Sequence, residues 1–190
     1  DVVDIGANKG QYHNMLRNIG YKGNVFLIEP LDLEWNYLKK NIVTNNSILL
    51  EKMAIGETNE YKILYNTQNS VSSSLKKRLN KDDIISQTKV KVNTLDEVIK
   101  TIQKDNVFVK IDSQGYEYEI VSSINESLKN IKIIQAELAI NVSYENEKDF
   151  IENIKMFESK GFKPIFIFPG ITNKEGFLSE IEVIFINSKI

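Results

Sequence analysis

The sequence predicts an α/β fold with a mostly parallel seven-stranded sheet, an antiparallel last strand and a small β insertion. Apolar strand patterns alternate with helical patterns along almost all of the 190 residues, as in parallel sheets. The first strand runs through a glycine turn directly into a helix. The last two strands, 164–168 and 182–186, are joined by a Pro-Gly loop without a helix, so they must pair antiparallel.

The other elements follow from apolar spacing and from helix start and stop signals. Thr94 and Glu97 form a capping box that begins a helix, while Gly20 and Gly161 end two others. The expected order is a strand at 2–3, a helix over 12–19, a strand at 24–29, a helix over 31–43, a strand at 47–54, a helix over 94–103, a strand at 107–112, a helix over 115–128, a strand at 132–138, a helix over 150–157 and the two final strands.

Two short alternating segments, 61–65 and 89–92, predict an insertion at about 61–93. The polar and charged stretch Asn66–Gln87 between them is the least core-like part of the chain. It is either a mobile surface loop with a short solvated helix or a lid over a substrate, and the pattern favours neither. We expect one domain over 1–190, and the strand already under way at Asp1 suggests a trimmed N-terminus.

Composition narrows the classes of function. The net charge is −2 and only two of the 24 basic residues are arginine, so the basic footprint of a nucleic-acid partner is missing. The absence of cysteine excludes disulfides, thiolate metal sites and cysteine nucleophiles, and it fits a cytoplasmic protein. No apolar stretch approaches the roughly 18 residues of a membrane span, so none is expected.

The most informative motif is D-I-G-A-N-K-G at residues 4–10. Gly6 and Gly10 allow a tight turn and a close approach of the backbone to a ligand. Backbone N–H groups and the positive end of the helix dipole then face one crevice. Asp4 adds a negative charge there, which suits a ligand that carries an amine or a sulfonium. S-adenosylmethionine carries both.

Glu29 is the second informative residue, because it ends a buried strand just before Pro30. An acid at this position holds the ribose hydroxyls of a nucleoside, although a solvated loop carboxylate is the plain alternative. A nicotinamide oxidoreductase is an alternative function on the same evidence. The G-x-G-x-x-G spacing of dinucleotide folds is absent, and Asp4 and the antiparallel ending also argue against it.

Several short motifs follow one another along essentially the whole chain. They are D-I-G-A-N-K-G at 4–10, I-E-P at 28–30, A-I-G at 54–56, T-L-D-E at 94–97, K-I-D-S-Q-G-Y-E at 110–117 and Glu137. Taken together, these motifs resemble the FkbM-type methyltransferases. The resemblance implies a Rossmann-like class I methyltransferase fold, S-adenosyl-L-methionine as cofactor, and O-methyl transfer to a hydroxyl of a sugar, glycan or other small natural product. The family motif K-I-D-V-E-G-x-E differs here, since Ser113 and Gln114 replace its Val and Glu.

The resemblance also implies where the cofactor binds. Its methionine part would lie against the glycine turn, its ribose against Glu29, and its adenine near residues 53–55. Met53 is equally at home in a core. The expected cofactor-binding residues are Asp4, Gly6, Ala7, Asn8, Gly10, Glu29, Pro30, Met53, Ala54 and Asp112.

The chemistry is expected beyond the carboxyl end of the fourth strand, at Asp112. Methyl transfer needs mainly alignment of the nucleophile and acceptance of its proton, and Asp112 suits both tasks. Glu117 and Glu137 can face the same pocket, although an acid in the first turn of a helix, like Glu117, is also favourable for the dipole alone. Lys110 is expected to pair with one of these acids.

Other readings of the polar residues stay open. We expect no metal, with Mg²⁺ bound by Asp112, Glu137 and Asn141 as a minor alternative. His13 is a second candidate base, although a lone helical histidine is more often a packing residue.

Tyr116, Tyr118 and Tyr144 either stack on a sugar ring or are simply half-buried. The altered Ser113-Gln114 pair is the only support for a non-catalytic nucleoside-binding relative. The loops 66–87 and 141–148 would select the small-molecule or glycan acceptor, and nothing in the sequence sets an oligomeric state.

Overall fold

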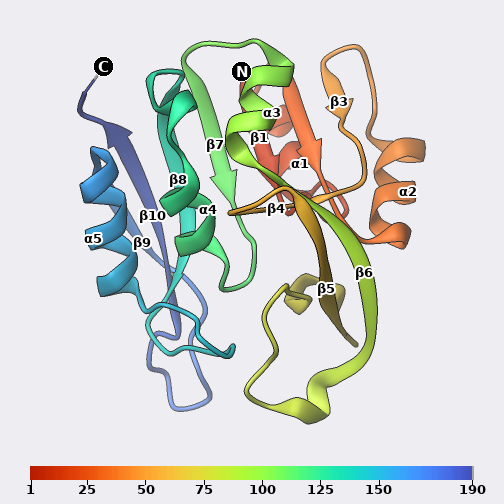
Figure 1. Cartoon of the computed structure of the whole chain (residues 1–190), viewed down its shortest axis with the longest axis vertical. Coiled ribbons are helices and arrows are strands. Elements are labelled where there is room, and N and C mark those ends of the chain that lie inside the picture. Colours follow the sequence, from red (N-terminus) through yellow and green to blue (C-terminus); the bar gives the residue numbers. More distant parts are fainter. Residues whose placement is uncertain (190) are drawn as a thin grey trace.

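The computed structural model describes residues 1–189 and is built on a seven-stranded sheet of order β3-β2-β1-β7-β8-β10-β9 (Figure 1). Within this sheet the strands β3, β2, β1, β7 and β8 are parallel to one another, and β10 is antiparallel to both of its neighbours, β8 and β9. This confirms the predicted fold class and the antiparallel ending. The strands are β1 Val2–Ile5, β2 Val25–Ile28, β3 Ser47–Leu49, β7 Val107–Ile111, β8 Ile131–Ala139, β9 Phe162–Pro169 and β10 Glu180–Asn187.

Helices cover both faces of this sheet. Side chains on a strand alternate between faces, so Val3 and Ile5 join the core under α3, α4 and α5, whereas Val2 packs with α1 and α2. Figure 1 shows α3, α4 and α5 on the near side of the sheet. The helices are α1 Gln11–Asn18, α2 Asp32–Asn41, α3 Leu95–Ile102, α4 Glu117–Ser123 and α5 Phe150–Lys160.

Side-chain caps and a glycine set several helix ends. The Thr94 hydroxyl accepts the Glu97 N–H at the start of α3, and Asp149 accepts the Glu152 N–H at the start of α5. Gly161 ends α5 with φ 100°, in the left-handed region that favours glycine. The predicted Thr94 cap is therefore present, but the Glu97 half of the capping box is wrong, because the Thr94 N–H donates to Asn93 Oδ1 instead.

The strand expected over 47–54 is wrong in one respect, because it is two strands in different sheets. β3 ends at Leu49, and β4 (Ala54–Gly56) pairs with β6 (Ile84–Thr94) instead. Between them Glu51 and Lys52 extend into solvent, where Glu51 pairs with Lys91. The charged residues Glu51 and Lys52 thus separate the apolar segments of β3 and β4.

The helix expected over 115–128 is also shorter than predicted. α4 ends at Ser123, and Leu128 lies in a separate 3-10 helix, η3 (Glu126–Lys129). The cause is Asp96 of α3, whose carboxylate accepts the N–H groups of residues 125, 126 and 127. These bonds begin a new turn where the sequence pattern alone would continue α4.

The predicted β insertion is a three-stranded sheet of order β4-β6-β5, in which β5 (Glu60–Thr67) is antiparallel to β6. Figure 1 shows the β5–β6 hairpin beyond the edge at which the parallel strands end. The segment 68–83 between them carries two 3-10 turns, η1 (Ser70–Ser72) and η2 (Lys81–Asp83). The solvated helix expected here is thus limited to η2.

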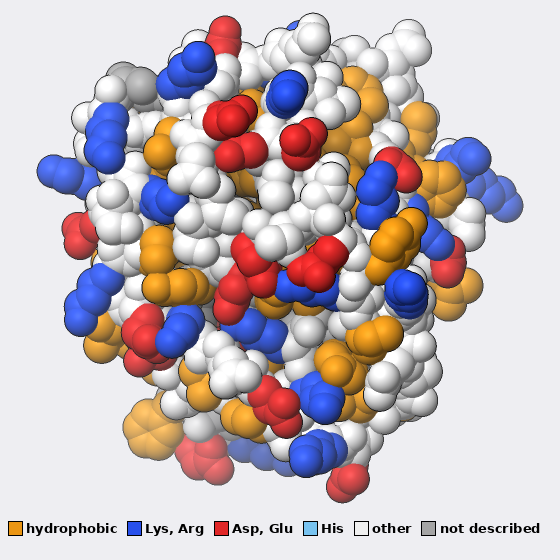
Figure 2. Space-filling view, viewed as in Figure 1, with side chains coloured by type: hydrophobic (Ala, Val, Ile, Leu, Met, Phe, Trp, Pro, Cys, Tyr) orange, Lys and Arg blue, Asp and Glu red, His pale blue; other side chains and the backbone are white. Residues whose placement is uncertain are grey.

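The surface shown in Figure 2 mixes acidic and basic side chains without a large area of one sign. This distribution agrees with the small net charge of −2. Within residues 1–189, no helix is both long and apolar enough to cross a bilayer.

Candidate functional site

A cavity lies at the carboxyl ends of β1, β2 and β7, where ligands gather in open α/β sheets. Most of the expected cofactor residues line it, and so does Lys110. Asp4 lies buried behind the cavity wall, and Gly10 packs against Leu38 and Ile42 of the α2 region. The lining residues are 5–8, 11–12, 28–31, 53–55, 64, 70–71, 73–75, 110, 112–114 and 116.

The glycine turn packs directly onto the tip of β7. Gly6 has φ 79°, and a Cβ built on it would lie 2.0 Å from the backbone oxygen of Asp112. The N–H groups of Gly6 and Ala7 both donate to the Ile28 carbonyl, at 3.1 and 3.0 Å. Only glycine at position 6 allows β1, β2 and β7 to meet this closely.

Glu29 is oriented by two backbone N–H groups. Asn8 donates to Oε2 at 2.9 Å and Leu31 donates to Oε1 at 2.8 Å. The side chain is buried, and burial raises its pKa to about 7, although both N–H groups lower it. Each oxygen keeps a lone pair for a further donor, such as a ribose hydroxyl.

Asp4 is the most unusual polar group of the site. Its side chain is fully buried, and neither oxygen has a hydrogen-bond partner among residues 1–189. Burial raises the pKa of Asp4 to about 6, with Lys110 lowering it and Asp112 raising it. A buried carboxylate without hydrogen bonds is costly, and because Asp4 does not line the cavity it acts on a bound ligand through its charge and not through a contact.

Lys110 and Asp112 form an ion pair at the tip of β7, with 2.7 Å between Nζ and Oδ2. Lys110 is opposite Asp4 in the β1–β7 register. Burial alone lowers the pKa of Lys110, but the carboxylates of Asp112 and Asp4 raise it above its ordinary value. The pairing expected for Lys110 is therefore present, and it places one buried cation between two acids.

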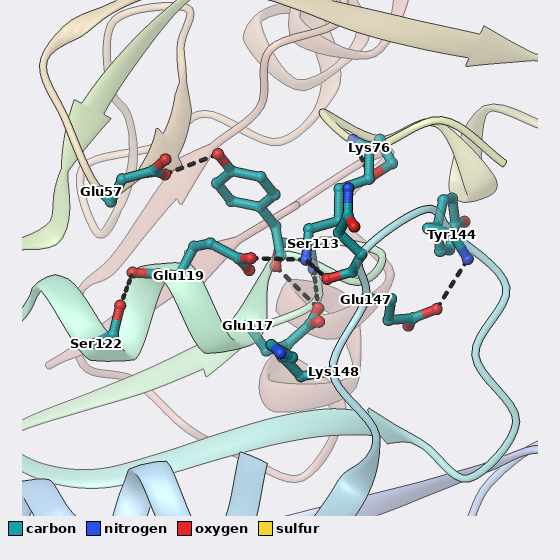
Figure 3. Close-up of polar contacts among 12 residues, drawn as sticks. Glu57, Lys76, Ser113, Glu117, Glu119, Ser122, Tyr144, Glu147 and Lys148 are labelled. Carbon is teal, nitrogen blue, oxygen red and sulfur yellow. Dashed lines mark hydrogen bonds and ion pairs between the residues drawn. The ribbon is translucent and has the colours of Figure 1, made fainter. Parts of the chain in front are cut away.

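Glu117 and Glu137 do not line the cavity. Glu117 accepts the N–H and the hydroxyl of Ser113, both at 2.9 Å (Figure 3), and burial raises its pKa to about 7. It thereby holds the turn that follows β7. Glu137 lies one strand away and contacts Gln114, whose Nε2 is 3.3 Å from its Oε2. Burial, followed by the charge of Asp112, raises the pKa of Glu137 well above its ordinary value, and Glu137 shares a hydrogen bond with the Glu180 carboxyl, so the two groups titrate as a pair.

The three tyrosine candidates lie at different places relative to the cavity. Tyr116 lines the cavity, and its hydroxyl donates to Glu57 at 2.7 Å and accepts from Lys62 at 2.6 Å. Tyr144 does not line the cavity but donates its hydroxyl to Gln114, which does. Tyr118 lies outside the cavity lining and carries Lys148 over its ring.

Two further candidates lie away from this chemistry. His13 is buried between α1 and β3, where Nε2 is 2.7 Å from the Ser47 hydroxyl, and it does not line the cavity. Asn141 is exposed and donates to the Leu178 carbonyl at 3.5 Å. In the described part of the chain, no group of three or more His, Asp or Glu side chains is arranged to hold a metal ion. The magnesium alternative therefore has no geometric support there.

The sequence did not identify which residues of the polar segment 66–87 reach the cavity. Ser70, Val71 and 73–75 line it, and the Asn8 amide donates to the Ser70 hydroxyl at 3.3 Å. The segment also joins the loop 141–148, through N–H bonds from Leu79 to Ser143 O and from Glu145 to Lys77 O. We call residues 70–79 together with 141–148 the cover. Its position over the site comes from backbone pairing between two loops, for which the sequence holds no spacing signal.

The chain is similar to known proteins both in sequence and in fold. A sequence model described as the methyltransferase FkbM domain matches residues 4–164. No curated protein matches the chain.

Many solved structures share the fold. A magnesium protoporphyrin IX methyltransferase from Synechocystis PCC 6803 with bound SAM has TM-score 0.56 at 11% identity, over 98% of this chain and 69% of that one. A putative S-adenosylmethionine-dependent methyltransferase from Listeria monocytogenes has TM-score 0.55 at 8% identity, over 98% and 90%. Fibrillarin from Aeropyrum pernix with S-adenosyl-L-methionine has TM-score 0.53 at 8% identity, over 97% and 65%. At such low identity these likenesses show the fold alone.

Proposed function

This chain belongs to the FkbM methyltransferase family, and from that membership and its cavity we propose an S-adenosylmethionine-dependent O-methyltransferase. The proposed acceptor is a hydroxyl of a sugar, glycan or other small natural product. The observation that carries the proposal is the Glu29 carboxylate, which two backbone N–H groups fix on the cavity wall. Asp4 does not line the cavity, but its buried negative charge behind the wall favours the ammonium and sulfonium groups of the cofactor through space.

The rest of the cavity supports the same ligand. Glu29, fixed by two N–H groups, is suited to the two ribose hydroxyls. Met53, Leu64 and Leu75, with the ring of Tyr116, form an apolar wall suited to adenine. A nicotinamide dinucleotide fits less well, because its pyrophosphate would be repelled by Asp4.

When bound, S-adenosylmethionine supplies a methyl group on a positively charged sulfur, which leaves as a neutral thioether when an acceptor oxygen attacks. Asp112 lies on the cavity wall and is proposed to orient the acceptor hydroxyl and take its proton. Lys110 holds that carboxylate in place through their 2.7 Å contact. Because the site has to align two bound molecules, most of its rate enhancement would come from positioning.

The proposal includes a cytoplasmic location, which the absence of cysteine supports. The non-catalytic alternative is supported by the Ser113-Gln114 pair, which removes a charge beside Asp112.

The test is methyl transfer from labelled S-adenosylmethionine to a panel of sugars, oligosaccharides and polyols. We expect Asp112→Asn to lower transfer by about 100-fold or more while S-adenosylhomocysteine still binds. Asp105→Asn, a change at an exposed residue, is the matched control. Full transfer by Asp112→Asn would exclude the proposed base, and cofactor binding without transfer to any acceptor would favour the non-catalytic relative.

A further inference from the structure

Gln114 occupies the junction of four segments of the site. It follows the tip of β7 with φ 53°, in the left-handed region. Its carboxamide lies between Asp112 and Glu137, and its backbone oxygen accepts the Ser74 hydroxyl of the cover at 2.7 Å. A residue held in a strained backbone conformation, with its carbonyl and both side-chain polar atoms engaged, is a candidate for a specific role.

The orientation of the carboxamide follows from its neighbours. Nε2 donates to Asp112 Oδ1 at 2.8 Å and lies 3.3 Å from Glu137 Oε2, while Oε1 accepts the Tyr144 hydroxyl at 2.9 Å. The reversed amide would direct its oxygen at the Asp112 carboxylate, which is repulsive. One neutral group thus supplies donors to both acids.

The charges around this pair are mostly negative. Glu137 faces Asp112 and Lys110 from β7 and Glu180 and Glu182 from β10. A glutamate at position 114 would add another carboxylate to this group, whereas Gln114 adds hydrogen-bond donors without charge. The replacement in the K-I-D-S-Q-G motif therefore has a physical consequence at Asp112.

On its other side Gln114 reaches the cover through Tyr144. The Tyr144 hydroxyl also contacts the Ser72 carbonyl at 2.9 Å and accepts from Arg78 Nη1 at 3.2 Å. Residues 78 and 144 form the backbone bridge that joins the two halves of the cover. A continuous chain of contacts therefore runs from the cover through Tyr144 and Gln114 to Asp112.

We propose that Gln114 is a positioning residue that couples closure of the cover to the placement of the Asp112 and Glu137 carboxyl groups. With the cover in place, Tyr144 fixes the carboxamide oxygen, and the amide nitrogen then fixes both acids. The general base is aligned when the two loops are joined over the site. This proposal deepens the proposed function, because the role of Asp112 as general base rests on that function. The contacts among the cover, Gln114 and the two acids do not depend on it.

The test measures the titration midpoint of the Glu137 carboxyl group from the ¹³C NMR shift of its carboxyl carbon. The signal of this carbon is identified by its loss in the variant Glu137→Gln. The chains compared are the original, Tyr144→Phe, Gln114→Gly and the double variant, with Tyr61→Phe at an exposed tyrosine as control. Glycine is chosen at position 114 because it adopts positive φ without strain. This readout needs neither cofactor nor acceptor, so its outcome is independent of whether the chain transfers methyl groups.

We expect Tyr144→Phe to raise the titration midpoint of Glu137 by about half a pH unit or more, because the released amide donates less well to the charged form. In the Gln114→Gly background the same change should have no further effect. An additional variant, Gln114→Glu, should raise the Glu137 midpoint above that of the original chain, because it replaces an amide donor with a second negative charge. An unchanged midpoint in Tyr144→Phe, or an equal effect with and without Gln114, would overturn the coupling.

Discussion

The backbone N–H of Asn8 donates a hydrogen bond of 2.9 Å to the carboxylate of Glu29, 21 residues further along the chain. This bond joins the glycine turn after β1 to the acid at the end of β2. The two motifs that were separate signals in the sequence are therefore one rigid unit. A ligand that contacts the turn also meets a carboxylate of fixed orientation.

The raised pKa of Glu29 predicts a pH-dependent stability. Burial raises this pKa from 4.5 to about 7, so between these values the folded state holds a proton that the unfolded state releases. Stability of the ligand-free protein must then fall as pH rises from about 5 to 8. Glu29→Gln removes this loss but keeps only one of the two N–H bonds. We expect the variant to be more stable than the original at pH 8 by about 1–2 kcal/mol, with little or no advantage at pH 5.

Urea unfolding at pH 5 and pH 8 measures this difference, with Glu175→Gln at an exposed loop residue as control. The same variant should bind S-adenosylhomocysteine about tenfold or more weakly, since a hydrogen bond to a charged group contributes about 1.5–3 kcal/mol. A variant less stable than the original at both pH values would contradict the account.

Much of the fold was predictable because local patterns determine it. The alternation of strands and helices, the Thr94 cap and the helix-free connection that makes the ending antiparallel each depend on residues close in sequence. The two errors depend on distant partners. Glu51 pairs with Lys91 where one expected strand divides in two, and Asp96 accepts three N–H groups where the expected helix stops.

The site was predictable to a similar degree. Gly6 and Glu29 line the cavity as motif spacing indicated, because a strand–turn–helix unit places them at one sheet edge. The orientation of Glu117 toward Ser113 could not be predicted, since an acid in the first turn of a helix can face either a ligand or the N–H groups of its own helix start. The contacts of Ser74 and Tyr144 with Gln114 could not be predicted either, because they are made by loops without regular structure.

The cover is predicted to depend on Arg78. Its guanidinium lies over the Tyr144 ring and its Nη1 donates to the Tyr144 hydroxyl at 3.2 Å. Removing it in Arg78→Ala should loosen the bridge, so the amides of Leu79 and Glu145 should exchange with deuterium about tenfold faster. Lys81→Ala in η2 serves as control. If both amides exchange at the original rate, the side-chain contact does not hold the two loops together.

The core beneath α5 gives a prediction on stability alone. Phe157 is fully buried, and its ring stacks on that of Phe185 at 4.2 Å between centroids. Phe157→Ala should cost about 3–5 kcal/mol of unfolding free energy. Ile151→Ala on the same helix, at a side chain 48% exposed, should change it by about 0.5 kcal/mol or less. Similar losses from both variants, measured by urea unfolding, would show that α5 does not pack as described.

The central claim is that the cavity at the carboxyl ends of β1, β2 and β7 is a site for S-adenosylmethionine. The most direct measurement is calorimetric titration of the purified chain with S-adenosylmethionine, S-adenosylhomocysteine, NAD and NADP, repeated on Asp4→Asn and on the control Asp105→Asn. The account predicts that only the two adenosyl ligands bind and that Asp4→Asn, which removes a buried negative charge behind the cavity wall, weakens both by about tenfold, while the control does not. Binding of NAD or NADP, or undiminished adenosyl binding by Asp4→Asn, would contradict it.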